Sequence, residues 1–216
     1  MKRGLFVTFE GIEGCGKSTQ LKLAADQLKI AGIRCFCTRE PGGTDIGSQV
    51  RKILLSESNS DLLPLCECLL YLADRFQHVS EILQPHLNED EVVLCDRYHD
   101  STVAYQGYAR GVPLEWLEAI WQGSGFALKP DLTLLLDVDP EVGLRRSFQK
   151  LRKEELDEWR FEKEEIAFHK RVRDGFLTLS ILEPQRIKVI DASGSIEEIH
   201  GKIMRILQDH NAELKL

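Results

Sequence analysis

The chain lacks any apolar run that approaches the roughly 20 residues needed to cross a membrane. It begins Met1-Lys2-Arg3, like a signal peptide, but the apolar stretch from Leu5 stops at Glu10, which is too short for a signal-peptide core. We therefore expect a cytoplasmic protein with no membrane partner. No internal repeat, low-complexity tract or long linker divides the 216 residues, so we expect a single domain over 1–216.

Cysteine occurs in no pattern typical of a disulfide scaffold or a zinc finger. The six cysteines include two C-x-C pairs, Cys35/Cys37 and Cys66/Cys68, but no C-x-x-C and no histidine at zinc-finger spacing. Their apolar surroundings favour buried free thiols, and a metal site made from both pairs is the alternative.

Positive charge is scarce, because 28 lysines and arginines face 35 acidic residues and the net charge is −7. Duplex binding depends on neutralising phosphates, so this balance argues against a nucleic-acid partner. If the chain binds a small anion, its positive groups must be concentrated locally.

Five short apolar runs alternate with helical patterns along the chain. The runs with the length and composition of buried strands are 5–9, 33–38, 92–95, 132–136 and 187–190. Helices are expected over 18–31, from 45 to 87 with a break at 56–61, between the last two strands, and after Ser195, which forms a capping-box pattern with Glu198. Pro85 predicts a kink or a last turn. The alternation predicts an α/β fold, a five-stranded parallel sheet with helices on both faces that binds ligands beyond the carboxyl ends of its strands.

The segment between the first strand and the first helix fits the phosphate-binding pattern G-x-x-x-x-G-K-[ST]. It comprises Gly11, Ile12, Glu13, Gly14, Cys15, Gly16, Lys17 and Ser18, followed by Thr19. Glycines let backbone N–H groups curl around phosphates, and the helix adds its positive end. We expect this P-loop, 11–18, together with Thr19, to bind ATP, with Lys17 on the β- and γ-phosphates and Ser18 on Mg²⁺. The alternative, a glycine-rich turn that happens to carry lysine and serine, fits the strand–loop–helix setting poorly.

Two further residue pairs suggest an acceptor for the phosphoryl group. Tyr71 and Arg75 are four apart on a predicted helix, so a ring and a guanidinium project from one face. A ring can stack on a base, and an arginine donor favours thymine, whose O4 is an acceptor, over cytosine, which has an amino group there. Asp96 and Arg97 follow the third strand directly, where Arg97 suits an acceptor phosphate and Asp96 suits either orienting Arg97 or supporting Mg²⁺ through water. The alternatives are core packing for Tyr71 with Arg75 on a solvated helix face, and a structural Asp96–Arg97 ion pair.

Five ordered motifs resemble the thymidylate kinase family over essentially the whole chain. They are Phe9-Glu10-Gly11 leading into the P-loop, Arg39-Glu40-Pro41-Gly42-Gly43-Thr44, Tyr71 to Arg75, Asp96-Arg97-Tyr98 with Ser101 to Gly107, and Asp137-Val138-Asp139-Pro140. No N-K-x-D guanine-binding tetrapeptide of GTPases occurs. The resemblance implies a P-loop nucleoside monophosphate kinase fold, and transfer of the ATP γ-phosphoryl group to dTMP in dTTP synthesis, with ATP and Mg²⁺ required and a homodimer as the assembly. A kinase for another pyrimidine nucleotide or a deoxynucleoside, and a nucleotide-hydrolysing switch protein, are the alternatives.

The resemblance also assigns roles to individual residues. For dTMP it implies Glu13, Arg39, Tyr71, Arg75, Arg97, Thr102, Tyr105 and Gln106. Within that set Arg97 contacts the phosphate, Tyr71 stacks on thymine, Arg75 and Thr102 reach its edge with help from Gln106, and Tyr105 lies under the deoxyribose. Lys17 and Arg97 are expected to be catalytic.

A charged segment, about 145–160, follows the fourth strand, where this fold class carries a closing lid. Some family members have a catalytic arginine at the P-loop position held here by Gly14, and those without it resemble a bacterial pattern in which the lid supplies the charge. The resemblance therefore favours Arg152 and Arg160 as catalytic residues. The alternative is an exposed helix with i,i+4 ion pairs such as Lys150 with Glu154.

Overall fold

A five-stranded parallel sheet forms the centre of the molecule. The structure, a computed structural model, describes residues 3–154 and 159–210, apart from the side chain of residue 154. The strands are β1 (Phe6–Glu10), β2 (Cys35–Arg39), β3 (Val92–Asp96), β4 (Leu132–Asp137) and β5 (Ile187–Asp191), in the order β2-β3-β1-β4-β5. All four strand pairings are parallel. The predicted five strands and their parallel arrangement are confirmed, with each strand shifted or extended by one or two residues.

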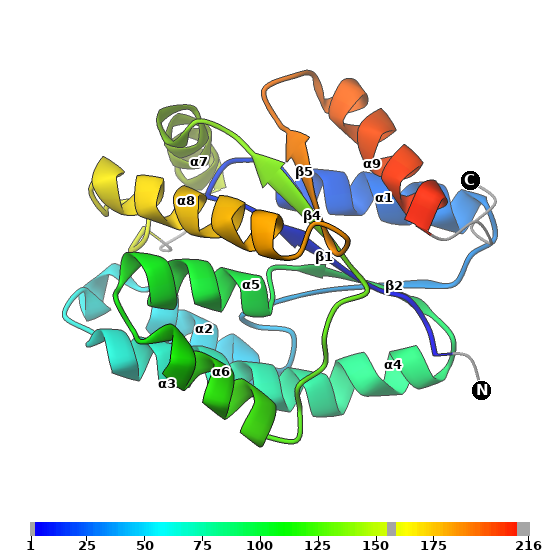
Figure 1. The fold of residues 1–216 in the computed structure, drawn as a ribbon. Helices are drawn as coiled ribbons and strands as arrows, with labels where there is room; N and C mark the ends of the chain where they lie inside the picture. The colour runs from blue at the N-terminus through cyan, green and yellow to red at the C-terminus, as the bar shows by residue number, and fades with distance from the viewer. Residues whose placement is uncertain (1–2, 155–158, 211–216) are drawn as a thin grey trace.

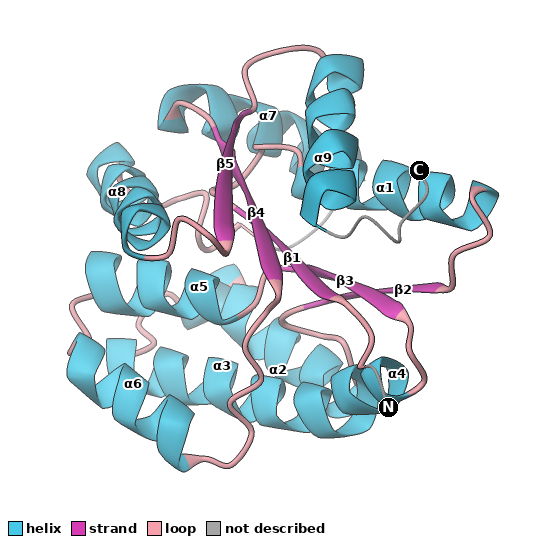
Figure 2. Ribbon diagram, turned by 45° about the vertical axis from the view of Figure 1, so that its right-hand side comes forward, coloured by secondary structure: helices cyan, strands magenta, loops and turns pink. Residues whose placement is uncertain are grey.

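Helices cover both faces of this sheet (Figures 1 and 2). One face carries α1 (Lys17–Ile30), α7 (Pro140–Glu154) and α9 (Ile196–His210). The other carries α3 (Pro64–His78), η2 (Val79–Leu83), α4 (Gln84–Asn88), α5 (His99–Thr102), η3 (Val103–Ala109) and α8 (Ile166–Leu182), with α2 (Asp45–Leu55) and α6 (Leu114–Gly123) outside them and η1 (Glu57–Asn59) following α2. None of the helices in the described ranges is both long and apolar enough to span a bilayer.

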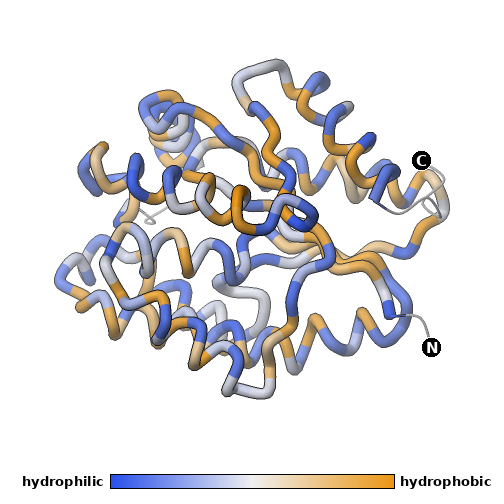
Figure 3. The backbone as a smooth tube through the Cα atoms, in the orientation of Figure 1, coloured by the Kyte–Doolittle hydropathy of each residue, from blue (hydrophilic) through white to orange (hydrophobic). Residues whose placement is uncertain are grey.

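The three central strands, β3, β1 and β4, are buried because their alternate residues pack against opposite helix layers, whereas the edge strands β2 and β5 are partly exposed. Val7 and Leu94 belong to the core beneath α1 and α9, whereas Phe6, Val93 and Cys95 belong to the core beneath η2 and α4. Figure 3 shows the same pattern, with apolar strands surrounded by helices of mixed hydropathy. The rigid sheet fixes the positions from which the loops at its carboxyl edge begin.

Local sequence rules explain several helix boundaries. Thr44 caps α2 by accepting a hydrogen bond from Gly47 N at 2.9 Å. Ser195 and Glu198 form the predicted capping box, with bonds of 2.9 and 3.2 Å. Pro85 lies in the first turn of α4, immediately after the π-helical turn η2. Pro85 disrupts regular α-helical bonding, and the wider turn before it accommodates the change while the helix continues.

The cysteines differ in part from expectation. All six are free, but Cys37 and Cys66 are exposed because they lie on the edge strand β2 and in the first turn of α3. The prediction of burial is therefore wrong for these two. Within the described residues no group of three or more histidine, cysteine, aspartate or glutamate side chains could hold a metal ion.

Candidate active site

The loop between β1 and α1 has the backbone geometry of a phosphate cradle. Gly11, Gly14 and Gly16 have φ angles of +134°, +68° and +101°, a region that favours glycine. The Lys17 ammonium lies inside the loop and donates to the carbonyl oxygens of Gly11 at 3.0 Å and Ile12 at 2.8 Å. Backbone carbonyls thus hold the lysine beside the position that the loop offers to phosphate.

Ser18 and Asp96 meet beside this loop. Ser18 is the second residue of α1, and Asp96 is the last residue of strand β3. The Ser18 hydroxyl donates to Asp96 Oδ2 at 2.5 Å. A hydroxyl and a carboxylate are the hard oxygen donors that Mg²⁺ prefers. The two residues predicted for magnesium therefore form a pair with suitable chemistry, and their role stays a prediction.

Arg97 occupies the centre of the site in a strained backbone conformation. Its φ of +69° is unusual for a residue with a side chain. The guanidinium donates to Gly11 O at 3.0 Å, Ser101 Oγ at 3.1 Å, Glu13 Oε1 at 3.0 Å and Tyr105 Oη at 3.1 Å. These bonds direct the arginine from the end of β3 toward the P-loop.

Glu13 links the P-loop to the opposite wall of the site. Its Oε1 accepts from Tyr105 Oη at 2.5 Å as well as from Arg97, and His169 Nδ1 lies 3.2 Å from its Oε2. Burial alone would raise the pKa of Glu13, but the close contact with His169 and the charge of Arg97 hold that pKa well below its usual range. Glu13 is therefore an ionised carboxylate within a buried network.

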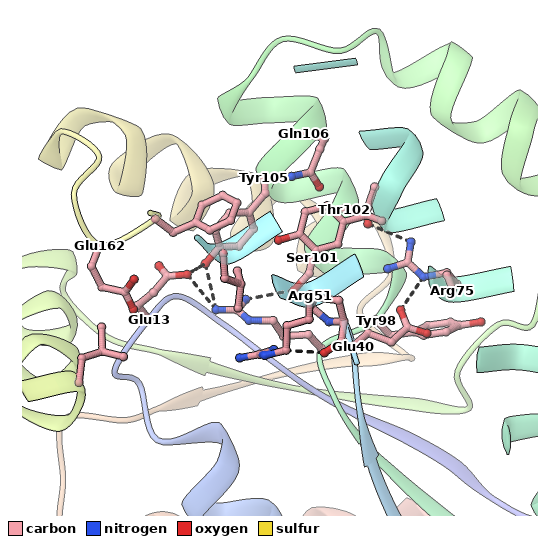
Figure 4. Close-up of a pocket in the computed structure, with 16 residues that line it drawn as sticks. Glu13, Glu40, Arg51, Arg75, Tyr98, Ser101, Thr102, Tyr105, Gln106 and Glu162 are labelled. Carbon is pink, nitrogen blue, oxygen red and sulfur yellow. Dashed lines mark hydrogen bonds and ion pairs between the residues drawn. The ribbon is translucent and has the colours of Figure 1, made fainter. Parts of the chain in front are cut away.

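A pocket extends from Glu13 to a second buried arginine on α3. Arg75 is 1% exposed, and it donates to Glu40 Oε2 at 2.8 Å and to Thr102 Oγ1 at 2.9 Å. His78 contacts the other Glu40 oxygen, Oε1, at 2.8 Å. Burial opposes the charge of Arg75, but the Glu40 carboxylate outweighs burial and raises the pKa of Arg75. Figure 4 shows Glu13 and Glu162 at one end of this pocket and Arg75 and Thr102 at the other.

Two further predicted residues line the same pocket. Tyr71, half-buried, lies one turn before Arg75 on α3, as the spacing predicted. Gln106 belongs to η3, a π-helical segment in which Arg110 N bonds to Tyr105 O five residues back. Single π-helical turns often occur at functional sites, where they change the direction of side chains.

The lid arginines lie in different environments. Arg160 is 5% exposed, and it donates to Asn59 O at 3.0 Å, Leu54 O at 3.1 Å and Glu67 Oε2 at 2.5 Å, so it attaches the lid to α2 and α3. Arg152 is exposed in the last turn of α7 and has no hydrogen bond or ion pair within residues 3–154 and 159–210. Neither arginine lines the pocket, whereas Leu151, Phe161 and Glu162 do. Residues 155–158 of the predicted lid lie outside the described residues.

The packing of α7 explains why position 14 of the P-loop is a glycine. A Cβ built on Gly14 would lie 1.9 Å from the carbonyl oxygen of Gly143 in α7. The lid helix therefore packs directly against the loop backbone. A catalytic arginine at position 14 is incompatible with this packing.

Some pocket residues differ from those expected. Arg39 is exposed at the end of β2 and does not line the pocket, whereas Arg51 from α2 does. No motif marked Arg51. Glu40 lies inside the recognised 39–44 motif, and Glu67 lies one helical turn before Tyr71, so spacing offered a clue to both carboxylates.

A phosphate cradle and a polar pocket, joined by Arg97 at the carboxyl ends of parallel strands, define a P-loop α/β kinase. The thymidylate kinase family model matches residues 9–203. The chain is 46% identical over 206 residues to a thymidylate kinase of Desulfosudis oleivorans, and 48% identical over 205 residues to one of Geobacter sulfurreducens. Each match covers 94% of this chain and 96% of the relative. A crystal structure of thymidylate kinase from Ehrlichia chaffeensis aligns with a TM-score of 0.74 at 34% identity, over 95% of this chain and 99% of that chain. The chain belongs to the thymidylate kinase family.

Proposed function

We propose that this protein transfers the γ-phosphoryl group of ATP to the 5′-phosphate of dTMP, giving dTDP and ADP. The observation that carries the proposal is the position of Arg97, which bonds to the P-loop at Gly11 and Glu13 and lines the pocket that ends at Arg75. A monophosphate on Arg97 would lie next to the donor phosphates, with its base at the far end of the pocket. The names and the identity of the relatives support the same reaction.

The far end of the pocket suits the donor and acceptor pattern of thymine. Arg75 uses Nε and Nη1 for Glu40 and Thr102, so a terminal N–H remains for an acceptor such as O4. Gln106 supplies an amide to the same end, and the Tyr71 ring offers a stacking surface. Tyr105, backed by Phe161, Phe168 and Phe176, forms the wall expected beneath the deoxyribose.

The transfer needs positioning and charge neutralisation and no general base. The second pKa of a phosphate monoester is about 6, so the acceptor is largely a dianion at neutral pH. Lys17 would neutralise the donor phosphates, Arg97 would hold the acceptor in line, and an arginine from the lid would add positive charge. Ser18 directly, and Asp96 through water, would hold Mg²⁺, which supplies further charge neutralisation when bound.

An ADP-release assay with different acceptors tests this function. We expect little ADP from ATP alone and rapid release when dTMP is added, with thymidine, uridylate and cytidylate much poorer. Preference for another pyrimidine nucleotide or for thymidine would identify a different kinase. Hydrolysis that needs no acceptor and rises with a protein partner would identify a switch protein.

We also propose a homodimer that forms through α2 and α3, which pack against each other. Ile46 and Ile53 on α2 and Leu65 and Leu69 on α3 are each 44–52% exposed. Apolar side chains gathered on adjacent helices are typical of a protein interface. Analytical ultracentrifugation of the wild type and Leu69→Arg tests this assembly, and a wild-type monomer at micromolar concentration would contradict it.

A further inference from the structure

Glu67 is a buried carboxylate that does not line the pocket but contacts a residue that does. It lies on α3 one turn before Tyr71 and is 0% exposed. Its Oε1 accepts from Gln106 Nε2 at 2.7 Å and from Arg110 Nε at 3.4 Å. Its Oε2 accepts from Arg160 Nη2 at 2.5 Å. Two guanidinium groups therefore balance its charge while one amide depends on it for orientation.

The chemistry of a carboxylate permits only one orientation of that amide. An ionised carboxylate accepts hydrogen bonds and donates none, so Gln106 must turn its NH₂ group toward Glu67. The amide carbonyl oxygen is then left for the pocket that Gln106 lines. Reversing the amide would place two acceptor oxygens in contact inside the protein, where an unpaired polar group is costly.

We propose that Glu67 is a positioning residue that determines which pyrimidine the pocket accepts. This inference rests on the proposed function. Thymine offers an N–H at N3 and an acceptor at O4, which match the fixed carbonyl of Gln106 and the N–H groups of Arg75. Cytosine offers an acceptor at N3 and an amino group at C4, so it opposes both residues. Figure 4 shows Gln106 near Thr102 and Arg75 at the same end of the pocket.

The proposal gives Glu67 a role that a purely structural residue would not have. A glutamine at position 67 can both donate and accept, so the Gln106 amide gains a second orientation at little cost. In that orientation its NH₂ group faces the pocket and suits N3 of cytosine. Glu67→Gln should therefore raise activity with dCMP as it lowers activity with dTMP, whereas loss of stability alone would lower both.

The test compares kcat/KM for dTMP and dCMP in the wild type, Glu67→Gln and a matched control, Glu164→Gln. Glu164 also accepts from Arg110, at 2.6 Å to Nη2, but has no bond to Gln106. The control therefore removes a carboxylate from the same arginine without releasing the amide. We expect the dTMP/dCMP ratio to fall by about tenfold in Glu67→Gln, the scale of one hydrogen bond, and to stay at the wild-type value in Glu164→Gln.

The ratio separates failure of this inference from failure of the proposed function. If the wild type phosphorylates dTMP and Glu67→Gln keeps the wild-type ratio, the inference is overturned and the function stands. A wild type that phosphorylates neither nucleotide overturns both. If Glu67→Gln does not fold, the ratio is measured on Glu67→Gln/Arg160→Met. In this double variant an apolar methionine replaces the arginine that would otherwise be buried without its carboxylate partner. An unchanged ratio there also overturns the inference.

Discussion

The donor end of the site consists mainly of backbone groups, whereas the acceptor end consists mainly of side chains. The donor end is mainly backbone, with glycines at positive φ and a lysine held by two carbonyl oxygens. The acceptor end is a network of buried side chains, in which Glu13 accepts a hydrogen bond from Arg97 and Glu40 accepts one from Arg75. Backbone N–H groups suit any triphosphate, whereas paired side chains fix particular donors and acceptors. We therefore expect substrate selectivity to reside at the acceptor end.

Removing the lysine should disable the donor end and leave the acceptor end intact. Lys17→Ala deletes the P-loop charge expected on the β- and γ-phosphates of the donor, so we expect kcat to fall by about 10³-fold. Binding of dTMP, measured by calorimetry, and the circular dichroism spectrum should remain near wild type. A turnover close to wild type would contradict the assignment of the P-loop lysine.

Two replacements of Arg97 should distinguish the contribution of its side chain to catalysis from the cost of its strained backbone. Both Arg97→Ala and Arg97→Gly lose the acceptor-phosphate contact, so kcat/KM for dTMP should fall by about 10²-fold in each. Glycine tolerates the φ of +69°, whereas alanine does not, so the glycine variant should be the more stable by about 1 kcal/mol. Urea denaturation measures the difference. Equal stability of the two variants would show that this backbone carries no strain.

The two lid arginines should differ in what they support. Arg160→Met removes a partner of the buried Glu67 carboxylate, so we expect the free energy of unfolding to fall by about 3 kcal/mol. The exposed Arg152 should tolerate Arg152→Met with stability within about 0.5 kcal/mol of wild type. If Arg152 reaches the phosphates on lid closure, kcat should still fall by about tenfold or more.

The same two variants, Arg152→Met and Arg160→Met, can also contradict the prediction that both lid arginines are catalytic. Full turnover in Arg152→Met would remove Arg152 from the catalytic set. A loss of turnover in Arg160→Met that exceeds its loss of folded protein would show that Arg160 acts in catalysis beyond its contacts with 54–67.

The sequence predicted those parts of the molecule that depend on local spacing. Strand–helix alternation predicted the parallel sheet, the P-loop pattern predicted the glycine backbone, and the i,i+4 spacing of Tyr71 and Arg75 predicted a shared face. Each of these relations spans a few residues, so it follows from chain geometry alone.

The partners of the acceptor arginines were not predictable in this way. Glu40 and Arg75 are 35 residues apart, and Glu13 and Arg97 are 84 apart, so only the tertiary fold brings them together. The lid is a similar case, because mixed charges along a helix predict the same surface whether an arginine is buried or exposed. Arg39 illustrates the limit, since its motif was recognised but its side chain lies outside the pocket.

The smallest effect is expected for the hydroxyl of Tyr71, and it tests whether the ring alone serves the acceptor end. Burial raises the pKa of Tyr71, so the hydroxyl stays neutral and adds no charge to the pocket. Tyr71→Phe keeps the stacking surface, and we expect KM for dTMP within about twofold of wild type. Tyr71→Ala removes the ring, and stacking on a base is worth about 1–3 kcal/mol, so KM should rise by about tenfold or more. If the alanine variant bound dTMP as well as the phenylalanine variant does, the base would lie elsewhere, and selectivity could not reside in the network around Arg75.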